Sequence, residues 1–267
     1  MPLLLLPLFA GCVSEQREQE MGDLMAIDIN AQLPMVEDPV LNAYVTSLGR
    51  ALARVSERPG LDYHFYVINS PTVNAFALPG GHIYLTRGLI EQTRSGGELA
   101  AALAHEIGHV AERHGVDKMQ RQLRTGSLVS VLYNLILGGE PDLLRRESLE
   151  LGGALWSARH SRQAEGEADA RAVEYLLRAG LDPDAMVSLL RKLVAVETQD
   201  SSRVAGWFSS HPLTRERIVE AEVEIDSAKG HFSVPEGDPT ALLPEYLKRY
   251  PLFLERLAGV PGPSLLR

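Results

Sequence analysis

A single five-residue pattern constrains this chain more than any other feature, because it places two histidines four positions apart with a glutamate beside the first. The pattern is His105-Glu106-Ile107-Gly108-His109, in a segment that opens with a capping box from Ser95 to Glu98 and has apolar residues at helical spacing. On a helix, residues four apart point in nearly the same direction, so both imidazoles can bind one metal ion. Glu106 lies about 100° further round the axis, within reach of a water molecule on the metal. The sequence therefore predicts a catalytic zinc site, with His105 and His109 as ligands and Glu106 as general base. The alternative is two surface histidines on a polar helix face.

The third ligand decides the type of site. A metzincin has a glycine three residues and a histidine six residues after the second histidine, but Glu112 and Gly115 occupy those positions here, and His114 is one residue out of register. The other source is a carboxylate on a later helix, in the segment Glu165-Gly166-Glu167-Ala168-Asp169. Glu165 and Asp169 share a face of that helix, so one can bind zinc while the other orients a ligand imidazole, whereas Glu167 points about 200° away from Glu165. Spacing alone leaves these three carboxylates open.

The remaining pattern predicts an α+β fold, mainly helical and zincin-like, with a small β-sheet beside the metal-binding helix. Two helices are expected over residues 15–56, broken at Pro34 and Pro39, and two strands over 63–68 and 82–86. Further helices are expected over 148–179, from Asp182, and over 212–227. The expected units are a zinc domain over 12–228 and a Pro-rich, mostly irregular tail over 229–267.

The N-terminus has the pattern of a lipoprotein leader. A short apolar run over residues 3–10 ends in Gly11 and Cys12, and the run is too short to span a bilayer. We expect residues 1–11 to be a signal peptide and Cys12 to be lipidated. Because Val13 is not aspartate, the periplasmic face of the outer membrane is favoured over the inner membrane. The alternative is an apolar N-terminal segment with an incidental buried cysteine.

The composition argues against several kinds of site and partner. Cys12 is the single cysteine, so neither an intrachain disulfide nor a cysteine-rich zinc site can form. The net charge is -9, which argues against nucleic acid as a partner, because nucleic-acid binding requires clustered Lys and Arg.

Four ordered segments resemble the gluzincin metallopeptidase family that includes the HtpX and Ste-type proteases, and in particular its periplasmic lipoprotein branch. The segments are Asn74 to Gly81, His105 to His109, Glu165 to Asp169, and Ser210-His211-Pro212 with Arg217 beyond. The resemblance covers about residues 18–228. It implies that Glu165 is the third zinc ligand and that Asp169 orients a ligand imidazole.

The resemblance also implies two further parts of the active site. His211 would lie near the zinc, binding it in a closed state or polarising the oxyanion; from the residues alone it could equally cap a helix before Pro212. The segment 74–81 would bind an extended peptide by β-addition, with Asn74, Ala75, Phe76, Gly80 and Gly81 as substrate-binding residues. A hairpin with a Gly-Gly turn would explain the same segment without a substrate.

The expected function is that of a membrane-anchored zinc metalloendopeptidase with one Zn²⁺ per chain. Its expected substrates are unfolded or misassembled cell-envelope proteins, and an association with the outer-membrane assembly machinery is possible by family analogy. The alternative is a chaperone-like or binding lipoprotein whose zinc site is closed by His211 or by residues 126–144.

Overall fold

The centre of the molecule is a three-stranded sheet of β1 (His64–Ile68), β2 (Ala75–Leu78) and β3 (His82–Thr86). The computed structural model describes residues 13–124, 160–199, 207, 210–212, 215–228 and 243–262. β3 lies in the middle of the sheet, parallel to β1 and antiparallel to β2. β2 is therefore an edge strand of the described sheet and uses only one of its two rows of backbone groups for pairing within it.

Two glycines build the turn between β2 and β3. The turn is the short helix η1 (Pro79–Gly81), in which Gly80 and Gly81 have φ angles of 80° and 93°. These angles favour glycine over any residue with a Cβ. A Cβ on Gly80 would also lie 2.9 Å from Cα of Gln19. The glycines therefore serve both the turn and its close approach to the first helix.

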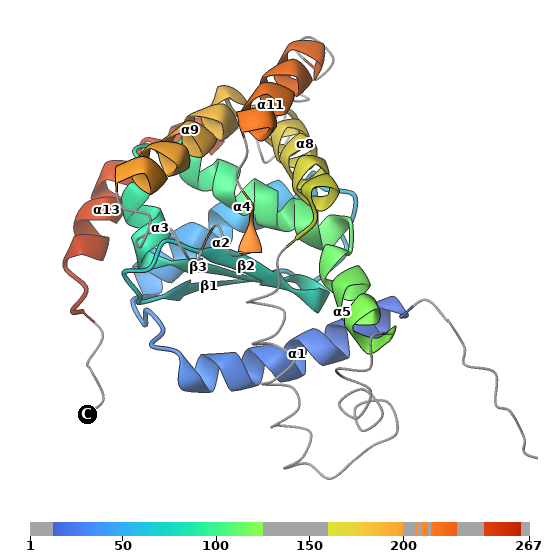
Figure 1. The fold of residues 1–267 in the computed structure, drawn as a ribbon. Helices are drawn as coiled ribbons and strands as arrows, with labels where there is room; N and C mark the ends of the chain where they lie inside the picture. Colours follow the sequence, from blue (N-terminus) through green and yellow to red (C-terminus); the bar gives the residue numbers. More distant parts are fainter. Residues whose placement is uncertain are drawn as a thin grey trace, which may run out of the picture.

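Helices cover both faces of the sheet (Figure 1). The first helix, α1 (Glu15–Gln32), lies along one face, and α2 (Pro39–Arg54) and α4 (Gly96–Ala111) lie against the other. An outer layer of α8 (Arg162–Arg178), α9 (Asp184–Gln199) and α11 (Arg215–Ala228) packs over α4. The other described helices are α3 (Arg87–Gln92), α5 (His114–Arg124), α12 (Leu243–Leu247) and α13 (Tyr250–Ala258). The predicted α+β architecture is confirmed.

The two faces of the sheet contribute to two hydrophobic cores, because side chains alternate along a strand. Ile83 and Leu85 of β3 belong to the larger core, with α2, α4, α8 and α9. Tyr84, between them, belongs to the smaller core under α1 and stacks on Phe76 at a centroid distance of 4.7 Å. The active-site helix α4 is thus enclosed by the larger core, and every residue from Glu98 to Val110 is buried.

Two sequence-based predictions of local structure are wrong. The tail was expected to be mostly irregular, but α12 and α13 form within it, and Tyr250, Phe253 and Leu257 join the larger core. The single helix expected over 148–179 is interrupted at His160 and Ser161, and α8 begins at Arg162, because Ser161 is extended (φ −72°, ψ 157°) and its side chain caps the helix. Residues 148–159 lie outside the described residues.

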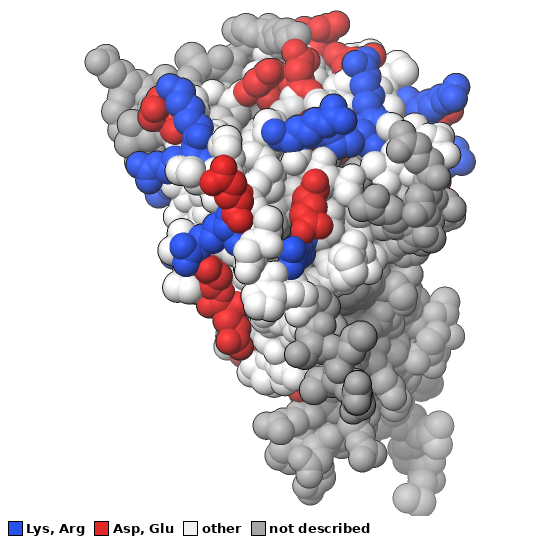
Figure 2. All heavy atoms as spheres, turned by 90° about the vertical axis from the view of Figure 1, so that its left-hand side faces the viewer, with Lys and Arg blue, Asp and Glu red and all other residues white. Residues whose placement is uncertain are grey.

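The leader (1–11), Cys12 and residues 126–144 lie outside the described residues. Within the described ranges, no helix combines the length and the apolar character needed to cross a bilayer. On the face drawn in Figure 2, basic side chains are interspersed with acidic ones.

Candidate metal centre and active site

Helix α4 presents the predicted motif, and its start is capped as the sequence predicts. Ser95 Oγ accepts a hydrogen bond from the Glu98 backbone N–H at 3.2 Å. The Glu98 carboxylate accepts from the Arg94 N–H at 2.6 Å and forms an ion pair with Lys192 of α9. The cap thus also anchors α4 to the outer layer of helices.

Helix α8 crosses α4 very closely where the motif carries a glycine. A Cβ on Gly108 would lie 3.0 Å from the backbone oxygen of Ala168. This contact brings the α8 face that bears Glu165 and Asp169 against the α4 face that bears the two motif histidines. The glycine inside the motif is therefore a packing requirement of the site.

Four buried side chains converge with their potential ligand atoms within 4.8 Å of one another: His105, His109, Glu165 and His211. The two motif histidines face each other through Nε2, at 3.1 Å. The Glu165 carboxylate lies 3.4 Å from His109 Nε2 and 3.7 Å from His105 Nε2. His211 Nδ1 lies 3.1 Å from Glu165 Oε1 and 3.4 Å from His105 Nε2. All three predicted ligands and the predicted nearby histidine are therefore brought together.

The Nδ1 atom of His105, which points away from the metal group, meets the carboxylate of Asp169. His105 Nδ1 lies 2.9 Å from Asp169 Oδ1. Asp169 also accepts two hydrogen bonds from Arg217, at 2.6 and 2.7 Å, and Arg217 Nη1 lies 2.7 Å from Glu165 Oε2. Asp169 thus contacts the ring of His105 at Nδ1. The sequence analysis gave Arg217 no role, and its place in an ordered motif, five residues after Pro212, was the only signal available.

The outward nitrogen of His109 meets a residue that the sequence analysis had set aside. His109 Nδ1 lies 2.9 Å from His114 Nδ1, and His114 Nε2 lies 3.0 Å from Glu167 Oε2. Glu167, one of the three open candidates, therefore does not belong to the metal group. His114 is out of register for a metal ligand, and the contact depends on the turn at Arg113 (φ 57°).

The donor set fits a zinc ion. Since each motif histidine directs Nδ1 at an oxygen or nitrogen partner, Nε2 of each is left to point into the centre, where a carboxylate also lies. Buried lone pairs that face one another at such distances repel unless a proton or a metal ion lies between them. Two imidazoles and a carboxylate are the ligand types of catalytic zinc sites, which keep a further position open.

Glu106 lies beside the metal group, next to His211. Both carboxylate oxygens are buried and have no hydrogen-bond partner within the described part of the chain. The nearest charged partner is His211, whose Nε2 lies 3.5 Å from Glu106 Oε1. Burial raises the pKa of Glu106 against the opposing effect of His211 and His105. A buried carboxylate with no hydrogen bonds serves no evident structural purpose.

The electrostatics of the site depend on which charges face each other. Burial opposes the charge of Glu165, but His211, His109 and Arg217 outweigh it and hold the pKa of Glu165 well below its usual range. Burial likewise lowers the pKa of His109. For His211, the carboxylates of Glu165 and Glu106 outweigh burial and raise its pKa. The centre thus combines an ionised Glu165 carboxylate with a neutral His109 imidazole, as metal binding requires.

The segment expected to bind substrate lies partly beside the metal group. His211 Nε2 lies 3.3 Å from the backbone oxygen of Ala75, at the start of edge strand β2. Asn74 is fully buried, and its Oδ1 lies 3.5 Å from Ser210 Oγ. The side chain of Phe76 lies in the smaller core. Gly80 and Gly81 contact α1 and residues 61–62.

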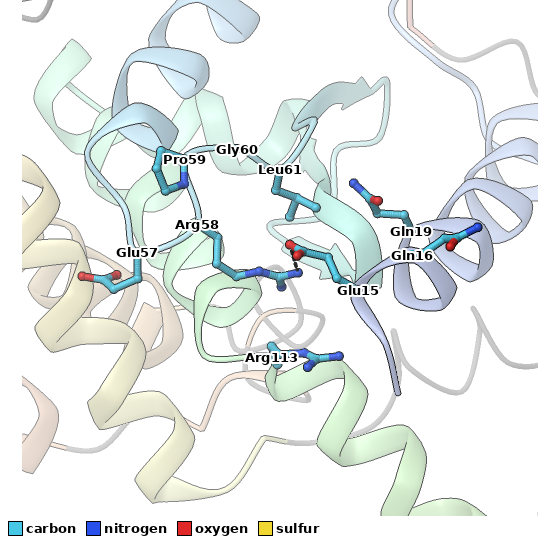
Figure 3. A pocket seen from close by; sticks show the side chains of 9 residues that line it. All are labelled: Glu15, Gln16, Gln19, Glu57, Arg58, Pro59, Gly60, Leu61 and Arg113. Atoms are coloured by element: carbon cyan, nitrogen blue, oxygen red, sulfur yellow. Dashed lines mark hydrogen bonds and ion pairs between the residues drawn. The ribbon is translucent and has the colours of Figure 1, made fainter. Parts of the chain in front are cut away.

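A surface cavity of about 620 Å³ lies apart from this group, between α1 and the loop that follows α2 (Figure 3). None of the four potential ligands lines it. Arg58, which projects into it, is engaged with Glu15 at 3.0 Å and with the buried Glu18 at 2.9 Å. Arg113, at its edge, lies 2.9 Å from Glu18. The arginines of this cavity are therefore committed to ion pairs within the chain.

Comparison with known proteins identifies consistent relatives. Residues 39–225 match the model of peptidase family M48. The chain is 33% identical over 240 residues to a β-barrel assembly-enhancing protease of Yersinia pestis, covering 88% of this chain and 48% of the relative. It is 31% identical to the mitochondrial metalloendopeptidase OMA1 of Schizosaccharomyces pombe, over 70% of this chain and 53% of the relative. It is 29% identical to the metalloprotease LoiP of Escherichia coli, over 65% of this chain and 66% of the relative. The chain spans about half the length of the β-barrel assembly-enhancing protease that it matches.

Proposed function

The chain belongs to peptidase family M48, and from this premise we propose that it is a zinc metalloendopeptidase. One observation carries the proposal: the buried ligand group His105, His109 and Glu165 lies beside Glu106, a carboxylate that has no hydrogen-bond partner among the described residues. A purely structural metal site would not need that carboxylate. The combination supports hydrolysis of a peptide bond.

The proposed reaction assigns one task to each residue. His105, His109 and Glu165 hold the zinc, which when bound supplies a Lewis acid that polarises the scissile carbonyl and acidifies the attacking water. Glu106 accepts the proton of that water and delivers it to the leaving amine. Asp169 holds the His105 ring, and Arg217 holds the two carboxylates. His211 is a catalytic residue in this proposal, positioned to stabilise the oxyanion.

The substrate would bind as an additional strand. β2 is an edge strand of the described sheet, and the backbone oxygen of Ala75 lies next to His211. An extended peptide paired with this edge by β-addition would pass the metal group. In this arrangement the backbone of Asn74, Ala75 and Phe76 contributes the contacts, because the Phe76 side chain lies in the smaller core, and Gly80 and Gly81 shape the turn.

The proposed setting is the cell envelope. Relatives named for β-barrel assembly favour unfolded or misassembled envelope proteins as substrates and a link to the outer-membrane assembly machinery. The sequence pattern around Cys12 supports a lipid anchor on the periplasmic face of the outer membrane. A Cys12→Ser variant should move from the membrane to the soluble fraction.

A second candidate function is a chaperone-like or binding lipoprotein with a closed site. The observation that favours it is the position of His211 Nδ1, 3.1 Å from Glu165 and 3.4 Å from His105, where it can act as a fourth ligand. A zinc ion with four protein ligands has no position left for water.

Cleavage of unfolded casein by purified, zinc-loaded Cys12→Ser protein tests the proposal, and a His211→Ala variant separates the two candidates. If His211 stabilises the oxyanion, the variant loses activity while keeping zinc. If His211 closes the site, the parent protein is inactive and the variant gains activity. An inactive parent together with an inactive variant contradicts the peptidase proposal.

A further inference from the structure

A chain of polar contacts runs from one ligand histidine to the protein surface, separate from the buried Asp169–Arg217 pair on the other side. It connects His109 to His114 at 2.9 Å and His114 to Glu167 at 3.0 Å. Gln163 Nε2 donates to the other Glu167 oxygen at 2.8 Å. The His114 side chain is nearly buried, with 7% exposed, whereas 44% of the Glu167 side chain is exposed.

The direction of the hydrogen bonds in this series of contacts follows from the chemistry of the residues at its two ends. A neutral histidine that binds a metal through Nε2 carries its proton on Nδ1. His109 therefore donates to His114 Nδ1, which must be an unprotonated acceptor. His114 then carries its proton on Nε2, and that N–H points to Glu167 Oε2. A carboxylate accepts at this end, so all three residues agree on one arrangement of protons.

Among the described residues, His114 is the partner at Nδ1 of His109, and Glu165 lies at the opposite nitrogen, 3.4 Å from Nε2, where the zinc would bind. His160 covers one face of the His109 ring, with a centroid distance of 4.1 Å, and His105 meets it edge-on at 4.6 Å. Neither contact selects which nitrogen carries the proton. His114 lies at Nδ1 and does select it.

We propose that His114 and Glu167 are positioning residues, which hold His109 in the Nδ1–H form and fix its ring for zinc. The inference rests on the zinc site of the proposed function. His114 acts directly on the ligand, and Glu167 acts through His114. Partners of this kind strengthen metal binding by about 10–100-fold in other sites.

The test compares amides that reproduce one nitrogen of His114 at a time. In His114→Asn, the amide oxygen can occupy the position of Nδ1 and accept from His109. In His114→Gln, the longer side chain reaches the position of Nε2 and leaves His109 without its acceptor. His114→Ala removes both contacts. Glu174→Gln is the matched control, because it removes a carboxylate from the same helix, where Glu174 pairs with Arg171 and Arg178.

Zinc affinity, measured by competition with a chelator on the full chain with Cys12→Ser, is the readout. We expect His114→Ala and His114→Gln to bind zinc about 10–100-fold more weakly, and His114→Asn and Glu174→Gln to stay close to the parent protein. Nitrogen-labelled, zinc-loaded protein should show the His109 proton on Nδ1 in the parent and in His114→Asn.

Two results would overturn the proposal. One is an unchanged zinc affinity in His114→Ala. The other is an equal loss of zinc affinity in His114→Asn and His114→Gln, because the affinity would then not depend on the acceptor that His109 meets at Nδ1. The proposed peptidase activity fails separately: a parent protein that binds zinc tightly but cleaves nothing contradicts that function and leaves the zinc-affinity comparison intact.

Discussion

Removing the guanidinium of the buried Arg217 should destabilise the protein far more than removing that of a more exposed arginine with at least as many carboxylate partners. Arg217 is 3% exposed and lies within 2.6–2.7 Å of carboxylate oxygens on Asp169 and Glu165. In Arg217→Met these two buried carboxylates lose their shared cation. Removing one partner from a buried ion pair costs about 3–5 kcal/mol.

Arg171→Met provides the matched comparison. Arg171 of α8 contacts three carboxylates, one more than Arg217: those of Glu57, Glu112 and Glu174, at 2.6–3.3 Å. Its side chain, however, is 34% exposed. Water screens these pairs, so we expect a loss of at most about 1 kcal/mol. The two variants therefore differ in burial while the chemistry removed is the same.

The assay is urea or thermal unfolding of the zinc-free proteins followed by circular dichroism. A loss of about 3–5 kcal/mol in the free energy of unfolding corresponds to a Tm lower by about 6–20 °C for a domain of this size. Arg217→Lys should fall between the parent and Arg217→Met, since lysine restores the charge but not the bidentate geometry. Equal losses in Arg217→Met and Arg171→Met would refute the argument that burial sets the cost.

Two further predictions concern the framework of the site. Lys192 and the Arg94 N–H outweigh burial and lower the pKa of Glu98 below 4.5. The contribution of the Glu98 carboxylate to stability is therefore present above pH 4.5 and is lost as the pH falls through the lowered value, so the difference in free energy of unfolding between the parent and Glu98→Gln should shrink on acidification below pH 4.5. A difference that grows on acidification would contradict the assignment. A Cβ on Gly22 would lie 2.0 Å from the backbone oxygen of Pro79, whereas a Cβ on Gly60 would meet nothing within 4 Å. In chemical denaturation, Gly22→Ala should lower the free energy of unfolding by about 1–3 kcal/mol or more, while Gly60→Ala stays near the parent. Equal effects would show that the contact between α1 and η1 is not tight.

The sequence predicted the active-site helix well because every signal for it is local. The Ser95 cap, the apolar spacing and the motif all lie within one segment, and each has the predicted position. The choice among Glu165, Glu167 and Asp169 could not be made from spacing, since it depends on how α8 crosses α4 at Gly108. The resemblance to a family implied Glu165, and Glu165 is the one of the three that lies in the buried ligand group.

The features that the sequence analysis missed depend on tertiary contacts or on the position of a proline. His114 reaches His109 through a turn at Arg113, a non-glycine residue with a positive φ, which no composition rule indicates. In the tail, Pro251 occupies the first turn of α13. Proline is well accommodated there because the first amide of a helix has no intrahelical partner. A proline interpreted as a sign of irregular structure was in fact a helix start.

The most direct test of the account is to compare the Cys12→Ser protein with the same protein carrying Glu106→Gln, measuring bound zinc by elemental analysis and cleavage of unfolded casein. Glu106 is placed to move a proton and is not among the four potential ligands, so we predict one zinc per chain in both proteins and cleavage only where Glu106 is intact. Loss of zinc in Glu106→Gln, or equal cleavage by both proteins, would contradict the proposed role of Glu106, and the absence of zinc from both would contradict the metal centre itself.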